Sequence, residues 1–81
     1  MEQEEVEKRL REIVVDKLRC EYDEITNESR PREFGADSLD EIEMLIEIEK
    51  EFNIYISDQE AERIITFGDA VEVVTRKVEA V

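Results

Sequence analysis

Ser38 is the residue whose type and position most suggest chemistry. It lies in residues 35–40 (GADSLD), where an acidic loop turns into an amphipathic helix. A serine nucleophile needs a base to take its proton, and the chain contains no histidine. The neighbouring carboxylates of Asp37 and Asp40 would not activate the hydroxyl either. We therefore predict no catalytic residue and no enzyme activity.

Two other roles fit a serine at this position. The first is a helix cap, which contributes about 1 kcal/mol, and Glu41 three residues later completes the pattern of a capping box. The second is a covalently attached group, because free N–H groups and the helix dipole favour a phosphate ester at a helix N-terminus. A separate modifying enzyme would then supply the chemistry. Position alone favours the cap and leaves attachment open.

The helix predicted after Ser38, over residues 38–52, has more apolar surface than one core contact needs. On a wheel of about 100° per residue, its apolar residues form two stripes. One stripe contains Met44, Leu45, Ile48 and Phe52, and the other contains Leu39, Ile42 and Ile46. The acidic residues Asp37, Asp40, Glu43 and Glu49 lie near the edges of the second stripe. Either both stripes are buried in a central helix, or the second is a docking surface with an acidic rim.

Hydrophobic periodicity along the rest of the chain predicts an all-α fold. We expect helices over residues 2–19, 38–52 and 57–64, and from residue 66 onwards. Ser57 and Thr66 begin capping-box patterns that start the last two helices. Residues 54–56 alternate in polarity, but no second strand could pair with them. We expect a linker there, with Ile54 and Ile56 in the core.

The predicted helices assemble as a small bundle of three main helices plus one short helix. In the first helix the buried face should comprise Val6, Leu10, Ile13, Val14 and Leu18, and in the last Ala70, Val71, Val74 and Val78. A long loop of about 17 residues, 21–37, joins the first two helices, and loops of that length are often functional or hold a helical turn. At 81 residues, we expect a single domain over residues 1–81.

Charge and composition exclude several classes of partner. Twenty-four acidic residues against eleven basic ones give a net charge of −13, which repels nucleic acid and anionic membranes. Partners with basic patches suit it better. No apolar run approaches the roughly 20 residues of a membrane span, so we expect no transmembrane segment. The many acidic residues raise the question of calcium binding, but no Asp-x-Asp-x-Asp-Gly loop is present. We therefore expect no metal site.

Cys20 is the only cysteine, which precludes an internal disulfide. A lone cysteine, together with a charged N-terminus unlike a signal peptide, indicates a reducing compartment, the cytoplasm. Cys20 itself is expected to be a small buried hydrophobe. We expect the chain to be a monomer.

The motifs together resemble acyl carrier proteins of the fatty-acid type. The resemblance rests on residues 35–40 (GADSLD), 42–43 (IE), 49–52 (EKEF) and 56–64 (ISDQEAERI), and it covers nearly the whole chain. It implies that a phosphopantetheinyl transferase moves 4′-phosphopantetheine from coenzyme A to Ser38. The thiol of that arm would carry acyl chains as thioesters, and the carrier itself would not be catalytic.

The resemblance also implies partners and a place for the acyl chain. Docking on fatty-acid synthesis enzymes with basic patches would use Asp37, Leu39, Asp40, Ile42, Glu43, Ile46 and Glu49. The acyl chain would be sheltered among Val14, Leu45, Ile48, Ile56, Ile64, Val71 and Val74.

Several residues depart from the family pattern. The departing positions are Arg30, Arg32, Phe34, Lys50 and Ser57. They leave the pathway open: the alternative to a carrier of fatty-acid synthesis is a specialised carrier, for example a polyketide, aminoacyl or lipid acyl carrier. A structural acidic subunit of a larger complex is the alternative from another class.

Overall fold

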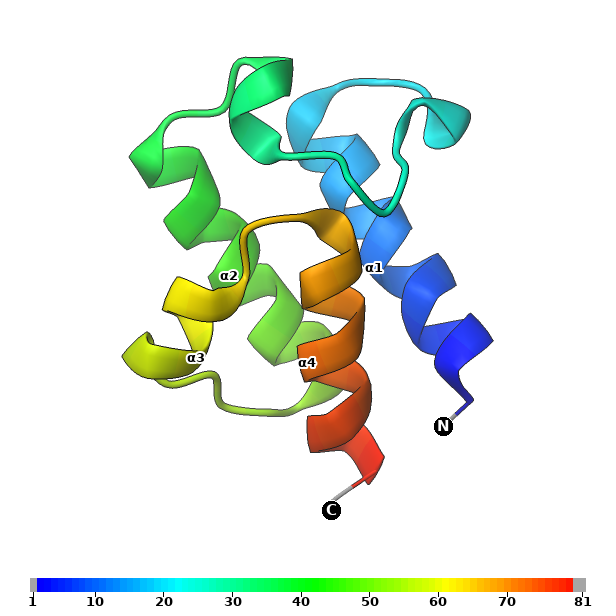
Figure 1. Ribbon diagram of the computed structural model, residues 1–81, viewed down its shortest axis with the longest axis vertical. Helices are drawn as coiled ribbons and strands as arrows, with labels where there is room; N and C mark the ends of the chain where they lie inside the picture. Colours follow the sequence, from blue (N-terminus) through cyan, green and yellow to red (C-terminus); the bar gives the residue numbers. More distant parts are fainter. Residues whose placement is uncertain (1, 80–81) are drawn as a thin grey trace.

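The computed structural model describes residues 2–79, which form four α-helices and two short 3-10 turns and contain no β-strand (Figure 1). In chain order the elements are α1 (Gln3–Leu18), η1 (Tyr22–Glu24), η2 (Pro31–Phe34), α2 (Ser38–Phe52), α3 (Asp58–Arg63) and α4 (Phe67–Glu79). The predicted fold is confirmed: three main helices and one short helix, with the long loop between α1 and α2. The bounds predicted for α2 are confirmed at both ends.

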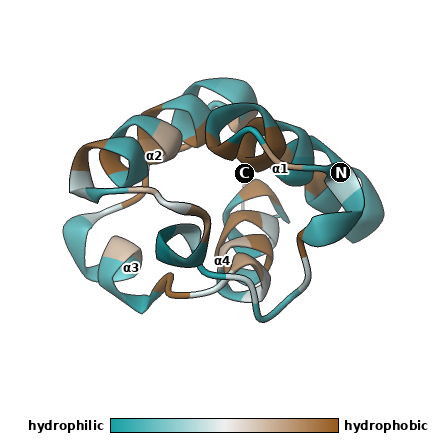
Figure 2. Cartoon of the chain, turned by 90° about the horizontal axis from the view of Figure 1, so that it is seen from above, coloured by the Kyte–Doolittle hydropathy of each residue, from teal (hydrophilic) through white to brown (hydrophobic). Residues whose placement is uncertain are grey.

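The three long helices enclose one hydrophobic core, and their apolar faces turn inward (Figure 2). Val6 and Leu10 on α1 and Val74 on α4 are fully buried. Ile56 in the linker is also buried, and Ile54 is partly buried against the same core, as the sequence predicts. Truncating one of the fully buried aliphatic side chains would leave a cavity that the bundle closes only in part.

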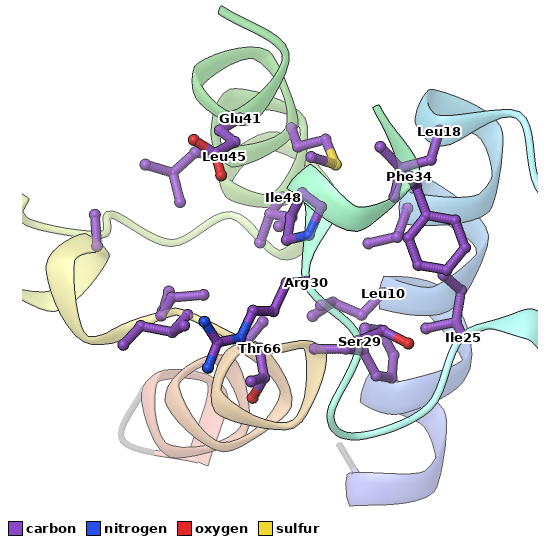
Figure 3. Close-up of a pocket in the computed structure, with 18 of the residues that line it drawn as sticks. Leu10, Leu18, Ile25, Ser29, Arg30, Phe34, Glu41, Leu45, Ile48 and Thr66 are labelled. Atoms are coloured by element: carbon purple, nitrogen blue, oxygen red, sulfur yellow. The ribbon is translucent and has the colours of Figure 1, made fainter. Parts of the chain in front are cut away.

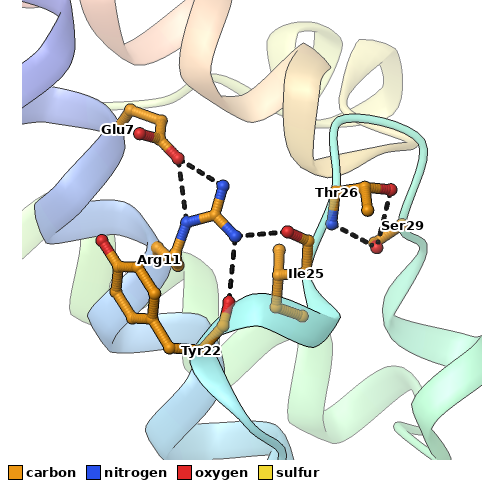
Figure 4. Close-up of polar contacts among 6 residues, drawn as sticks. All are labelled: Glu7, Arg11, Tyr22, Ile25, Thr26 and Ser29. Atoms are coloured by element: carbon orange, nitrogen blue, oxygen red, sulfur yellow. Dashed lines mark hydrogen bonds and ion pairs between the residues drawn. The ribbon is translucent and has the colours of Figure 1, made fainter.

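Arg11 fastens the long loop to α1 (Figure 4). Its guanidinium donates to the Tyr22 carbonyl oxygen at 3.0 Å and to the Ile25 carbonyl oxygen, and it forms an ion pair with Glu7. The same guanidinium lies 5.0 Å from the ring centres of Tyr22 and Phe67. A cation over aromatic faces is favourable, so one side chain joins α1, the loop and the start of α4.

Two backbone hydrogen bonds fix the far side of the loop against α4. Phe67 N donates to Ser29 O and Gly68 N donates to Asn27 O, both at 2.9 Å. A Cβ at position 68 would lie 3.0 Å from Asn27 O, which is tighter than an ordinary contact, so this close approach favours glycine. The loop is thereby held as a folded part of the molecule, and its end can place Ser38 reproducibly.

Candidate functional site

Asp37, and not Ser38, caps α2. Asp37 Oδ1 accepts from Asp40 N at 2.9 Å, and Asp40 Oδ2 accepts from Asp37 N at 3.1 Å, which is a reciprocal capping box. The predicted Ser38–Glu41 box is therefore wrong by one residue. Gly35 (φ 88°) ends η2 in the left-handed region and Asp37 then takes the extended conformation of a cap. Ser38 becomes the first helical residue, and its hydroxyl is not used by the cap.

The Ser38 hydroxyl is exposed and has a cationic neighbour. Arg32 Nη2 donates to Ser38 Oγ at 3.1 Å and lies 3.3 Å from Glu41 Oε1. A guanidinium is always protonated in proteins, so it cannot take the serine proton. The contact argues against a serine nucleophile and agrees with a hydroxyl on which another enzyme acts.

A mainly apolar cavity of about 320 Å³ lies among the helices (Figure 3), and Ser38 is one of its lining residues. Leu45 and Ile48 on α2 lie on one side of it, and Thr66, just before α4, lies on another. Four of its lining residues are exposed, and these lie where the cavity meets solvent: Arg30, Ser38, Ile42 and Ile65. The volume is at the small end of ligand pockets, which span about 300–1,000 Å³.

The cavity uses only part of the lining that the sequence predicted. Val14, Leu45, Ile48 and Ile64 line it, as predicted. The other three predicted residues do not line it: Ile56, Val71 and Val74 are buried within the core. Apolar residues that were not predicted for the cavity also line it, including Ile42 of the second stripe of α2: Leu10, Leu18, Ile25, Pro31, Phe34, Ile42, Met44, Ala61, Ile65, Phe67 and Ala70. The loop and α3 thus contribute surfaces that a helical wheel could not assign.

The second apolar stripe of α2 faces solvent. Leu39, Ile42 and Ile46 are 62%, 55% and 44% exposed, whereas Met44, Ile48 and Phe52 are buried. The interpretation that α2 is a central helix with both stripes in the core is wrong. An exposed aliphatic strip that starts next to Ser38 is the surface expected of a protein contact.

The acidic residues around this stripe are partly engaged within the chain. The Glu43 carboxylate accepts from Lys17 Nζ at 2.6 Å, and this hydrogen bond raises the pKa of Lys17. Glu49 Oε2 accepts from Ile56 N at 2.8 Å and so supports the linker after α2. Asp37 and Asp40 hold the capping box. The stripe keeps an acidic rim, but each of its four carboxylates also has a structural partner.

No role was predicted from the sequence for Lys17 or Arg32. Both are basic residues that reach α2 from elsewhere, Lys17 from α1 and Arg32 from η2. The one available signal was that Arg32 interrupts a loop that is usually acidic or apolar in the family. Cys20 is only partly buried, which corrects the expectation of a buried side chain.

Residues 2–79 contain neither a cluster of metal ligands nor a membrane-spanning helix. No group of three or more His, Cys, Asp or Glu side chains there could hold a metal ion. No helix in that range has the length and apolar character to cross a bilayer.

A small helical bundle with an exposed serine at a helix start, an apolar cavity beside it and an exposed docking stripe has the features of a carrier domain. The chain matches the family described as "Phosphopantetheine attachment site" over residues 8–74. It is 45% identical over 75 residues to the acyl carrier protein of Porphyromonas gingivalis, covering 91% of this chain and 96% of the relative.

Solved structures agree. The acyl carrier protein of Enterococcus faecalis superposes with a TM-score of 0.81 at 33% identity, covering 95% of this chain and 99% of that one. The acyl carrier protein of Thermotoga maritima gives 0.78 at 29% identity, covering 99% and 94%. The chain belongs to the acyl carrier protein family, and it carries acyl groups on a 4′-phosphopantetheine cofactor.

Proposed function

We propose that Ser38 is the attachment point of 4′-phosphopantetheine and that the loaded chain presents acyl thioesters to fatty-acid synthesis enzymes. The observation that carries this proposal is the position of the hydroxyl. Ser38 Oγ is free of the helix cap, exposed at the first residue of α2 and on the rim of the apolar cavity. A group bonded there can reach both the cavity and a docked partner.

The residues around Ser38 fit the arm. The first turn of α2 offers N–H groups without partners inside the helix, and these favour an attached phosphate. Attachment forms a bond from Ser38 Oγ to phosphorus and breaks the pyrophosphate bond of coenzyme A, with the adenine nucleotide leaving. The serine proton passes to a base of the transferase. When bound, the arm supplies a thiol that holds the acyl group as a thioester.

The chain itself is proposed to be non-catalytic. Ser38 Oγ meets the guanidinium of Arg32, which can donate a hydrogen bond but cannot accept a proton. Nucleophilic catalysis by serine needs an acceptor at that place. Reactions at the thioester therefore belong to the partner enzymes.

The cavity suits the acyl chain as a temporary shelter. Its wall is mostly aliphatic, and branched aliphatic side chains can separate without breaking hydrogen bonds. An acyl chain entering from the Ser38 side would pass between Leu45 on α2 and Ile64 after α3, both of which line the cavity.

Docking is proposed on the exposed stripe of α2. Leu39, Ile42 and Ile46 would supply the apolar contact, and Asp37, Asp40, Glu43 and Glu49 would face basic residues of the partner. We further propose that residues 1–81 act as a single monomeric carrier domain in the cytoplasm, as the lone cysteine suggests.

Intact-protein mass spectrometry tests the attachment. After incubation with coenzyme A and a phosphopantetheinyl transferase, the chain should gain the mass of one phosphopantetheine, and Ser38→Ala should gain none. Ser29→Ala is the matched control, because Ser29 also lines the cavity but is not the proposed attachment point. Its loading should equal that of the wild type. Loading of Ser38→Ala, or none of the wild type with an active transferase, would overturn the proposal.

Binding to a fatty-acid condensing enzyme tests the docking surface. Ile46→Ala should weaken binding about fivefold or more, as expected for an apolar contact that becomes buried at an interface. Ile46 does not line the cavity, so the effect would report docking alone. Tyr55→Ala is the control, because Tyr55 is 71% exposed and lies outside the stripe. Equal affinity of wild type and Ile46→Ala would remove the stripe from the proposal.

A further inference from the structure

One cation stands beside the attachment hydroxyl in an otherwise acidic neighbourhood. Arg32 Nη2 lies 3.1 Å from Ser38 Oγ and 3.3 Å from Glu41 Oε1. The capping carboxylates of Asp37 and Asp40 flank the same serine in the sequence and carry negative charge. A phosphate added at Ser38 would therefore lie near three carboxylates. Arg32 carries the positive charge that already contacts Ser38 Oγ, the atom to which the phosphate is added.

We propose that Arg32 binds the phosphodiester of the loaded protein and holds the start of the arm against η2. This inference rests on the proposed attachment at Ser38. Once Oγ is esterified it is a weaker acceptor, and the non-bridging oxygens lie one bond beyond the phosphorus. A guanidinium within hydrogen-bond distance of Oγ reaches those oxygens by rotation of its own side chain.

The competition between acceptors favours the phosphate. The ion pair of Arg32 with Glu41 is exposed, with 66% and 37% of the two side chains accessible, and exposed pairs contribute little. The planar fork of a guanidinium matches two phosphate oxygens at once. Arg32 would bind the phosphodiester and stay close to Glu41, and so neutralise the new charge in this acidic region.

The contact has a consequence for partner enzymes. With its phosphate held on the η2 side, the arm starts next to Pro31, which lines the cavity. A basic residue of a docked enzyme would have to compete with Arg32 for the phosphate before the arm could extend into the partner. Arg32 is thus a positioning residue for the prosthetic group.

Nuclear magnetic resonance of the loaded protein tests the contact directly. Converting the apo form to the loaded form should shift the Arg32 Nε–Hε signal in the wild type. Arg32→Gln should change the ³¹P chemical shift of the arm and narrow its line, because the phosphate becomes more mobile. Raising the salt concentration should move the wild-type ³¹P signal towards that of Arg32→Gln, since ions screen exposed pairs.

Two further variants separate this role from a general charge effect. Arg76→Gln removes the same charge from an exposed ion pair, that of Arg76 with Glu72 at 2.7 Å, and should leave the ³¹P signal unchanged. Glu41→Gln removes the competing carboxylate and should enlarge the Arg32 Nε–Hε shift on loading.

Mass measurement distinguishes the two possible failures. If the chain gains phosphopantetheine while the Arg32 signal stays in place and the ³¹P signals of wild type and Arg32→Gln coincide, the Arg32 contact is wrong and the attachment stands. If no mass is gained at Ser38, the attachment fails and the contact fails with it.

Discussion

Replacing Asp37 with alanine should cost the apo protein more stability than replacing Ser38, although Ser38 is the proposed attachment point. The two residues are neighbours, but only the Asp37 side chain accepts a hydrogen bond from a backbone N–H at the start of α2. The Ser38 hydroxyl points to Arg32. The perturbations are Asp37→Ala, Asp37→Asn and Ser38→Ala.

The geometry sets the magnitude for Asp37→Ala. The change removes the acceptor of Asp40 N, a 2.9 Å hydrogen bond, and leaves the reverse bond from Asp37 N to Asp40 Oδ2 intact. Loss of a capping side chain costs about 1 kcal/mol. Relief of repulsion with nearby carboxylates offsets a few tenths of a kcal/mol. We expect a net loss of about 0.7 kcal/mol, or roughly 3–6 °C in Tm for a domain of this size.

Ser38→Ala should stay within about 0.5 kcal/mol of wild type. It loses one exposed hydrogen bond with Arg32, and it gains the higher helix propensity of alanine. Asp37→Asn keeps an acceptor at the cap and should lose only a few tenths of a kcal/mol.

Urea unfolding followed by far-ultraviolet circular dichroism measures these differences. The loading assay completes the test, because Asp37→Ala should still gain phosphopantetheine while Ser38→Ala should not. If Ser38→Ala lost as much stability as Asp37→Ala, Ser38 would be the cap and the assignment of the cap to Asp37 would be wrong. No loss on Asp37→Ala would refute it equally.

Three further predictions concern Lys17, Asp69 and Cys20. Lys17→Gln should free the Glu43 carboxylate and tighten binding to a basic partner about two- to fivefold in titration calorimetry. Hydrogen bonds from Thr66 and the preceding backbone N–H lower the pKa of Asp69. In urea titrations, the wild type should therefore have a larger free energy of unfolding than Asp69→Asn above about pH 4. This difference should disappear as the pH falls further and the carboxylate of Asp69 is protonated. Burial chiefly raises the pKa of the Cys20 thiol, so iodoacetamide should alkylate the arm thiol before Cys20, as peptide mass spectrometry would show.

Each of these three has a clear contrary outcome. Lys50→Gln removes the same positive charge at an exposed lysine on α2. If it raised the affinity as much as Lys17→Gln, the effect of Lys17→Gln would come from net charge and not from freeing Glu43. A stability difference between wild type and Asp69→Asn that did not change with pH would show that the carboxylate is not stabilised by folding. Equal alkylation rates of the two thiols would contradict the raised pKa of Cys20.

The helices and the family could be predicted from the amino-acid sequence alone. Apolar spacing and caps act over one or two turns, so the bounds of α2 and the starts set by Ser57 and Thr66 were readable without a structure. The exposed stripe of Leu39, Ile42 and Ile46 was also visible as a surplus on the helical wheel. What the wheel could not decide was whether another element covers that stripe.

The details of the site depend on how distant segments of the chain pack together, which local patterns do not contain. The cap lies at Asp37, one residue before the predicted Ser38, because Gly35 ends η2 in a left-handed conformation. The capping pattern in the sequence does not contain this property of the backbone. Loop residues line the cavity and Val74 does not, because the position of a cavity depends on how several elements pack together. Arg32 and Lys17 reach α2 from other elements, and which charges meet in an acidic chain depends on how those elements pack.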